Sequence, residues 1–119
     1  MSKLILVVED DNSIRELLVE LLQSEGYNVA TAINGLEGLN YLKHNKTPDL
    51  ILMDLMMPVM DGYAFRTEQM KNPQWTKIPV VVMSAEANAK EKLKNFGITA
   101  FLGKPVELEI ILKTIALYS

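Results

Sequence analysis

The chain places charged or polar side chains directly after apolar runs that have the length of buried strands. The run LILVV is followed by Glu9 and Asp10, and the run LILM by Asp54. A third run, VVVM, is followed by Ser84, and a fourth, AFL, is followed by Gly103 and Lys104. An ionised carboxylate in apolar surroundings costs several kcal/mol unless something pairs with it. Asp54 therefore needs a partner from elsewhere in the chain.

A divalent cation is the partner that these residue types predict. If Glu9, Asp10 and Asp54 converge, they repel one another and raise one another's pKa. Lys104 supplies one positive charge, which does not balance three carboxylates. Magnesium prefers one or two carboxylates, several waters and often a phosphate oxygen. We therefore expect Asp10 and Asp54 to share one cation if their strands are neighbours, about 4.8 Å apart.

Each of these residues also has a purely structural interpretation. An acid after a strand often serves only to stabilise the next helix, whose N-terminal end carries partial positive charge, by about 0.3–1 kcal/mol. This explains Asp11. It does not explain Asp54, which lies in an apolar run followed by the loop sequence PVMDG. Ser84 alone is most often a strand-end hydroxyl, and Lys104 alone a solvated lysine. Their joint placement at one edge favours a functional site.

Strands and helices alternate along the chain and must position these residues. The predicted strands are Leu4–Val8, Asn28–Ala32, Leu50–Met53, Val80–Met83 and Ala100–Leu102. Such alternation needs right-handed crossovers and implies a parallel sheet that is covered on both faces. The predicted fold is a five-unit, doubly wound α/β domain, whose ligand site lies beyond the carboxyl ends of the strands.

Apolar residues at helical spacing predict the helices between the strands. We expect Asn12 to cap the first helix and Gly26 to stop it. Gly38, inside the second helix, should cost about 1 kcal/mol relative to alanine. The third helix, from about Tyr63 to Lys71, is weakly patterned. The stripes of the other four are Ile14, Leu17, Leu18, Leu21 and Leu22; Leu36, Leu39 and Leu42; Ala89, Leu93 and Phe96; and Leu108, Ile111, Leu112 and Ile115.

Length and composition favour one globular domain over residues 1–119. Hydrophobic residues make up 49% and charged residues 23% of the 119 residues, as in globular proteins. A net charge of −3 argues against direct nucleic-acid binding. The absence of cysteine excludes disulfides and thiolate chemistry. The apolar run Leu4–Val8 is too short for a signal peptide or a membrane span, so we expect a cytoplasmic location without membrane contact.

The motifs LILVVEDD, LILMDLMMPVMDG, PVVVMSA and FLGKP, in this order, resemble the receiver domain of bacterial two-component response regulators. The resemblance covers the whole chain, whose size is close to that of the single-domain chemotaxis regulator. It implies a flavodoxin-like (βα)5 sandwich with strand order 2-1-3-4-5. It also implies a phosphoacceptor in signalling that assists its own phosphorylation and dephosphorylation and is not an enzyme in the usual sense.

The resemblance assigns a metal-binding and phosphoacceptor role to the acidic residues. Asp54 matches the residue that takes a phosphoryl group from a kinase histidine and forms an acyl phosphate. Asp10, Asp54 and the backbone carbonyl of Met56 match the direct Mg²⁺ ligands, and Mn²⁺ is expected to substitute. Glu9 matches the acid that acts on the metal through water.

The resemblance also assigns a switch. Ser84 matches a hydroxyl that bonds one phosphoryl oxygen, and Lys104 matches an ammonium that pairs with another. A cis bond before Pro105 is implied, which aims Lys104 inward. Phe101 matches an aromatic switch residue that turns toward the core when Ser84 moves inward. Glu86 matches a position that influences water access to the phosphoryl group.

The expected partners follow from the same resemblance. A sensor histidine kinase or a phosphotransfer protein should donate the phosphoryl group. A downstream effector protein should bind the face made by the fourth helix, the fifth strand and the fifth helix. The domain should be a monomer or a weak dimer that depends on phosphorylation.

Three other classes of protein are alternatives. A phosphatase of the haloacid-dehalogenase type needs a second acid two residues after Asp54, where this chain has Met56. A flavodoxin-like electron carrier needs a phosphate loop after the first strand, and EDDNS would repel phosphate. A receiver-fold interaction module that never takes phosphate ranks lower, because acceptor, acids, hydroxyl and lysine are all present.

Overall fold

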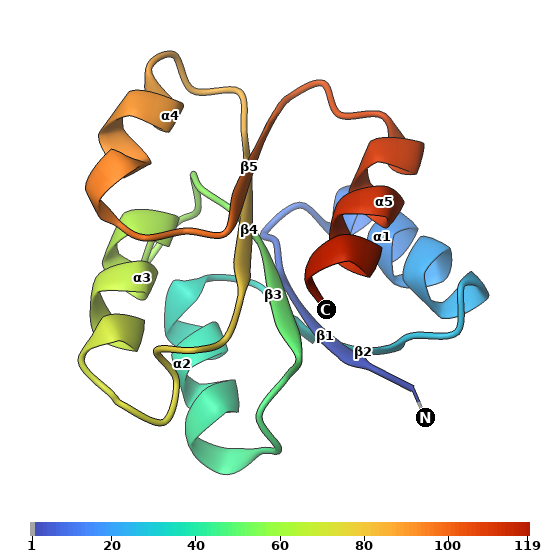
Figure 1. The fold of residues 1–119 in the computed structure, drawn as a ribbon, viewed down its shortest axis with the longest axis horizontal. Coiled ribbons are helices and arrows are strands. Elements are labelled where there is room, and N and C mark those ends of the chain that lie inside the picture. The colour runs from blue at the N-terminus through green and yellow to red at the C-terminus, as the bar shows by residue number, and fades with distance from the viewer. Residues whose placement is uncertain (1) are drawn as a thin grey trace.

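All five predicted strands are present in the computed structural model, which describes residues 2–119 (Figure 1). Three of them extend one residue beyond the predicted end, so Asp54, Ser84 and Gly103 are the last residues of their strands. The strands are β1 Leu4–Val8, β2 Asn28–Ala32, β3 Leu50–Asp54, β4 Val80–Ser84 and β5 Ala100–Gly103.

The strands form one parallel sheet in the order β2-β1-β3-β4-β5, which confirms the predicted fold class. β1 lies between β2 and β3, so the acidic loop after β1 adjoins the end of β3. The register pairs Asp54 with Met83 and Ser84 with Gly103. The backbone N–H of Lys104 then donates to the carbonyl of Ser84 at 2.8 Å. This register places Asp54, Ser84 and Lys104 on or next to adjacent strands. They lie within one or two residues of the same level at the carboxyl ends of these strands.

The sheet is covered on both faces, because successive residues of a strand point to opposite sides. Figure 1 shows α1 and α5 on one face and α2, α3 and α4 on the other. Both resulting cores are made of side chains from the sheet and the helices. The first includes Ile5, Val7, Leu18, Leu22, Leu52, Ile111 and Ile115, and the second includes Leu6, Val8, Leu39, Leu42, Ile51, Met53, Phe65 and Leu93.

The helices are α1 Asn12–Ser24, α2 Gly35–His44, α3 Gly62–Met70, α4 Ala89–Lys92 and α5 Leu108–Tyr118. The prediction of Asn12 as the cap of α1 was wrong, since Asn12 is the first helical residue. Asp11 is the N-cap, because its backbone is extended and its Oδ1 accepts the N–H of Ile14 at 2.9 Å. No helix formed by residues 2–119 is both long enough and apolar enough to cross a bilayer.

The fourth helical segment is shorter and less regular than its apolar spacing predicted. α4 has four residues and continues as a 3₁₀ turn, η1, over Leu93–Asn95. Asn88, which precedes it, has a φ of 66° and makes no side-chain cap bond. Ala89 and Leu93 are nevertheless buried against the core, as their spacing indicated.

Candidate metal and phosphoacceptor site

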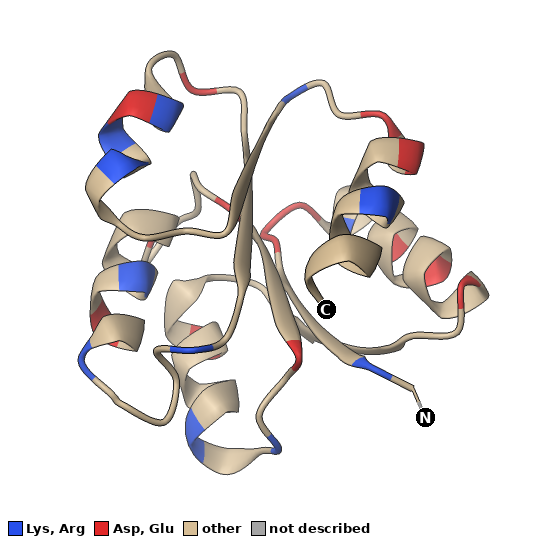
Figure 2. Cartoon of the chain, in the orientation of Figure 1, with Lys and Arg blue, Asp and Glu red and all other residues tan. Residues whose placement is uncertain are grey.

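Three carboxylates meet where β1 and β3 end. Ligand oxygens of Glu9, Asp10 and Asp54 all lie within 4.8 Å of one another. Glu9 and Asp54 are buried, with 1% and 7% of their surfaces exposed, whereas Asp10 is open to solvent. Figure 2 shows acidic segments in the loop after β1 and a basic segment in the loop after β5. The structure therefore brings together the three acids that the sequence selected.

Glu9 is a buried acid whose pKa departs from its ordinary value. Its Oε2 accepts the N–H of Asp11 at 3.1 Å, but its Oε1 is the one buried side-chain oxygen or nitrogen of residues 2–119 that has no hydrogen-bond partner. Burial raises the pKa of Glu9 to about 7. The bond from the Asp11 N–H lowers this pKa by a smaller amount, and the charges of Asp54 and Lys104 then raise and lower it, respectively. The predicted repulsion contributes through the charge of Asp54, but burial is the larger cause of the raised pKa.

These donors fit a hard divalent cation. The unpartnered Oε1 of Glu9, the buried carboxylate of Asp54 and the exposed carboxylate of Asp10 are all oxygen ligands, which magnesium and manganese prefer. A cation among them would compensate the charge that burial disfavours on Glu9. Met56 follows two residues after Asp54 in the β3–α3 loop, with 54% of its surface exposed. Its side chain is not needed for any of these contacts.

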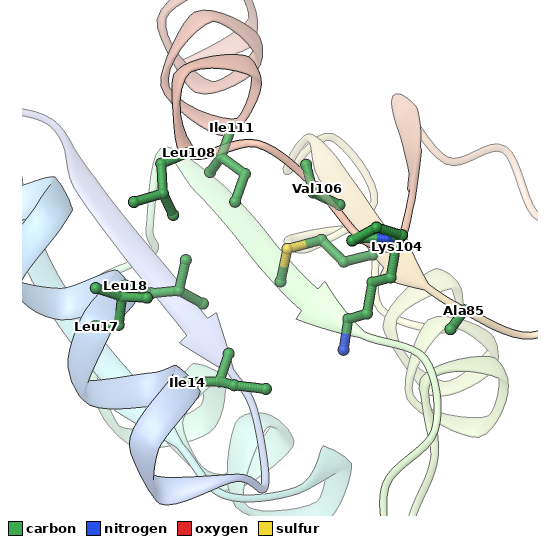
Figure 3. Close-up of a pocket in the computed structure, with 10 residues that line it drawn as sticks. Ile14, Leu17, Leu18, Ala85, Lys104, Val106, Leu108 and Ile111 are labelled. Carbon is green, nitrogen blue, oxygen red and sulfur yellow. The ribbon is translucent and has the colours of Figure 1, made fainter.

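Lys104 is directed at Asp54 by the packing of its own stem. Its Nζ lies 3.2 Å from Oδ1 of Asp54, and the Lys104–Pro105 peptide bond is cis. The stem lines an apolar pocket of about 420 Å³ between α1 and α5, together with residues such as Leu18 and Ile111. In Figure 3 the amino end of Lys104 leaves this pocket toward the carboxyl end of β3. A lysine stem on apolar surface keeps its charged head outside, so the pocket aims the ammonium.

Ser84 closes the site on the side of β4. Its side chain is 2% exposed, and its Oγ accepts the N–H of Glu86 at 2.9 Å. A hydroxyl has a hydrogen to donate in addition to its accepting lone pairs. Ser84 can therefore still donate to an oxygen bound at Asp54.

Arg15 is a part of this site that the sequence reading missed. Its Nη1 donates to the backbone carbonyl of Glu9 at 2.9 Å, and its Nη2 donates to the side chain of Asn12. The guanidinium thereby ties the acidic loop to the first turn of α1. The sequence offers one signal for this role. Arg15 lies five residues after Asp10, in the first turn of the helix, from where its side chain can reach the loop.

Comparison with known proteins identifies the class. The family model of the response regulator receiver domain matches residues 5–116. The chemotaxis response regulator CheY4 of Vibrio cholerae is 32% identical, with a TM-score of 0.91 and all of both chains covered. The response regulator TrrA of Thermotoga maritima, solved in complex with Mg²⁺ and BeF, is 29% identical with a TM-score of 0.87, covering 98% of this chain and 99% of that one.

Curated relatives extend beyond the matched region. The sensor histidine kinase RcsC of Escherichia coli is 40% identical over 118 residues, which are 98% of this chain but 12% of RcsC. Two further relatives are 52% and 56% covered, so the chain spans about half their length.

The chain belongs to the response regulator receiver domain family. It is a phosphorelay receiver, a signalling domain and not a metabolic enzyme, and a phosphatase of the haloacid-dehalogenase type is not favoured.

Proposed function

We propose that residues 1–119 form a receiver domain in which Asp54 accepts a phosphoryl group from a phosphohistidine. The observation that carries this proposal is the position of Asp54, a buried strand-end carboxylate. It lies next to two further acids and 3.2 Å from the ammonium of Lys104. A merely structural carboxylate needs one partner, whereas Asp54 lies among groups that suit metal and phosphate binding.

In the proposed transfer an oxygen of Asp54 attacks phosphorus while the bond from phosphorus to the donor's imidazole nitrogen breaks. The nitrogen leaves with the electron pair, and Asp54 becomes an acyl phosphate. Charge in such a loose transition state lies on the equatorial oxygens, so donors placed around them stabilise it. Lys104 supplies an ammonium and Ser84 a hydroxyl for these oxygens. No general base is needed, because Asp54 reacts as a carboxylate.

Mg²⁺ is the proposed cofactor, with Mn²⁺ as a substitute. Asp10, Asp54 and the Met56 carbonyl would hold the ion directly, and Glu9 through water. When bound, Mg²⁺ neutralises negative charge on the acids and on the phosphoryl oxygens. Support comes from the oxygen-only donor set here, and from the magnesium named in the structure of TrrA.

The proposed switch runs from Ser84 to Phe101. A phosphoryl group at Asp54 would offer oxygens to Ser84 and Lys104 and draw the β4–α4 loop inward, which is a two-state response to one modification. Phe101 is half-buried and lines surface pockets of about 330 and 240 Å³, one against α5 and one against α4. This free space on both sides suits a ring that changes rotamer. Phenylalanine has no hydroxyl, so the change would be steric.

The proposed partners are a sensor histidine kinase or phosphotransfer protein as donor and an effector at the α4-β5-α5 face. A monomer, or a weak dimer formed on phosphorylation, is the proposed state. A cytoplasmic location, self-assisted dephosphorylation and the lack of nucleic-acid binding stay predictions.

Incubation with Mg²⁺ and acetyl phosphate tests the central assignment. We expect one added phosphoryl mass that hydroxylamine removes, and its loss in Asp54→Asn. Asp49→Asn is the matched control, because Asp49 lies at the opposite edge of the sheet, where Oδ2 accepts the N–H of Leu4 at 2.8 Å. Equal labelling of Asp54→Asn and the wild type would remove Asp54 as acceptor.

A further inference from the structure

Glu86 contacts three elements at once. Its backbone N–H donates to Oγ of Ser84 at 2.9 Å. One carboxylate oxygen accepts the hydroxyl of Tyr63, in the first turn of α3, at 3.0 Å, and the other accepts Nζ of Lys92, in α4, at 2.7 Å. We refer to Tyr63, Glu86 and Lys92 as the Glu86 bridge. It joins the strand-end hydroxyl of the site to both helices beside it.

The bridge is well defined but easily opened. The Tyr63 ring packs edge-on against Phe96, with centroids 5.5 Å apart, so its hydroxyl is held in place. The Lys92 side chain, in contrast, is 55% exposed. Lys92 and then Tyr63 lower the pKa of Glu86, consistent with a charged acceptor for both groups. An exposed ion pair of this kind contributes little, so α4 is held only weakly through it.

The opposite end of the α4–η1 segment is held by a buried arginine. Nε of Arg66 donates to the carbonyl of Phe96 and Nη2 to that of Gly97, both at 2.8 Å. Arg66 is 4% exposed, and its Nη1 also donates to Gln69. Breaking these bonds would leave buried polar groups without partners, which is costly. The segment is therefore anchored just after its C-terminal end by Arg66, and the Glu86 bridge holds it only weakly at Lys92, the last residue of α4.

We propose that Glu86 is a positioning residue that transmits the position of Ser84 to Lys92, the last residue of α4, while Arg66 fixes the residues that follow η1. Because the Glu86 backbone is bonded to Ser84, a shift of Ser84 displaces Glu86. The bridge then either carries α4 along or opens. While the bridge holds, the segment turns about the Arg66 anchor; if the bridge opens, α4 is released at Lys92. The use of this coupling in signalling rests on the proposed function, but the coupling itself exists without phosphate.

Amide hydrogen exchange of the unmodified protein tests the bridge. The N–H of Lys92 bonds to the Asn88 carbonyl, and the N–H of Leu93 to that of Ala89, so both amides report on α4. Tyr63→Phe removes one hydroxyl and retains the ring. We expect about three- to tenfold faster exchange at both amides, from the loss of one part-buried hydrogen bond of ordinary strength. The Phe96 amide, beside the Arg66 anchor, should change least.

Lys71→Met is the matched control, since it removes another exposed ion pair, to Glu68 at 2.6 Å, far along α3 from the bridge. It should leave exchange in α4 unchanged. Unchanged exchange in Tyr63→Phe, or equal acceleration in Lys71→Met, would overturn the role of the bridge.

A double-mutant cycle tests the coupling to the site. Ser84→Ala removes the acceptor of the Glu86 N–H and should speed exchange at Lys92 and Leu93. In the Lys92→Met background, which lacks the bond between Glu86 and α4, the same change should add much less at the Leu93 amide. Fully additive effects, or no effect of Ser84→Ala on α4, would refute transmission through Glu86. Since no phosphodonor is used, failure of Asp54 to take phosphate would not change this result.

Discussion

Nζ of Lys104 lies 3.2 Å from Oδ1 of Asp54, although the two residues are 50 positions apart in the sequence. Adjacent strand ends and an apolar pocket around the lysine stem produce this ion pair. Among the ion pairs of residues 2–119 it is the one that involves a carboxylate of the acidic cluster.

Removing this charge should slow phosphoryl uptake without abolishing it. We expect Lys104→Ala to reduce the rate by about a hundredfold, as for other donors that stabilise transition-state charge. The measurement is the time course of the added mass with acetyl phosphate and Mg²⁺. Lys113→Ala, which loses an exposed pair to Glu109 at 3.4 Å, should react at the wild-type rate. Wild-type kinetics in Lys104→Ala would show that the pair is only structural.

Without metal, stability should fall as pH rises, because of Glu9. Its pKa is raised from 4.5 to about 7 in the folded protein, so the folded state binds more protons than the unfolded state between these values. The free energy of unfolding therefore declines from about pH 4.5 to about pH 7. Glu9→Gln should remove this decline and be more stable than the wild type at pH 8 in EDTA, by urea unfolding. Glu16→Gln, a change at an exposed position of α1, should show the same decline as the wild type. A free energy of unfolding that does not change with pH in the wild type would contradict the raised pKa of Glu9.

Mg²⁺ should stabilise the folded protein through the acidic cluster. A ligand that binds only the folded state adds about 2.7 kcal/mol at 100 times its Kd. We expect a rise in melting temperature with Mg²⁺ at pH 8, and its loss in Asp10→Asn. Asp49→Asn should respond as the wild type does. A response retained in Asp10→Asn would place the metal elsewhere.

Gly38→Ala should destabilise the protein, although helix propensity alone predicts a gain of about 1 kcal/mol. A Cβ at Gly38 would lie 2.9 Å from Cε1 of Phe65 and 3.5 Å from Cγ2 of Val8. Phe65 is fully buried, so its ring has little room to move, and overpacking of this kind costs about 1–3 kcal/mol. Urea unfolding shows whether Gly38→Ala lowers or raises the free energy of unfolding. Asn40→Ala, on the exposed face of the same helix, should stabilise slightly; a stabilised Gly38→Ala would show that Phe65 adjusts freely.

Leu36 and Gly38 show that the hydrophobic pattern of a helix does not predict how closely the next helix packs against it. Leu36 is on the predicted apolar stripe of α2, yet 46% of its surface is exposed, while Gly38 is buried. Periodicity gives the direction in which a side chain points. How closely two helices approach depends on the residues of the partner helix, here Phe65 of α3, and these are distant in the sequence.

The sequence by itself determined the strands, their parallel arrangement and the convergence of Glu9, Asp10, Asp54, Ser84 and Lys104 on one edge. It did so because alternating strands and helices leave few topologies, and strand-end positions are local. Membership of the family and the fold are confirmed by the comparisons, while the individual roles of these residues stay proposals.

Only the tertiary structure decided which groups are paired and which are not. The unpartnered Oε1 of Glu9, the anchor at Arg66 and the bridge from Tyr63 to Glu86 follow from distances between elements far apart in the chain. Hydrogen bonds depend on tenths of an ångström, which residue spacing does not specify. The charge balance of the site, and the way α4 is held, therefore had to be read from the folded molecule.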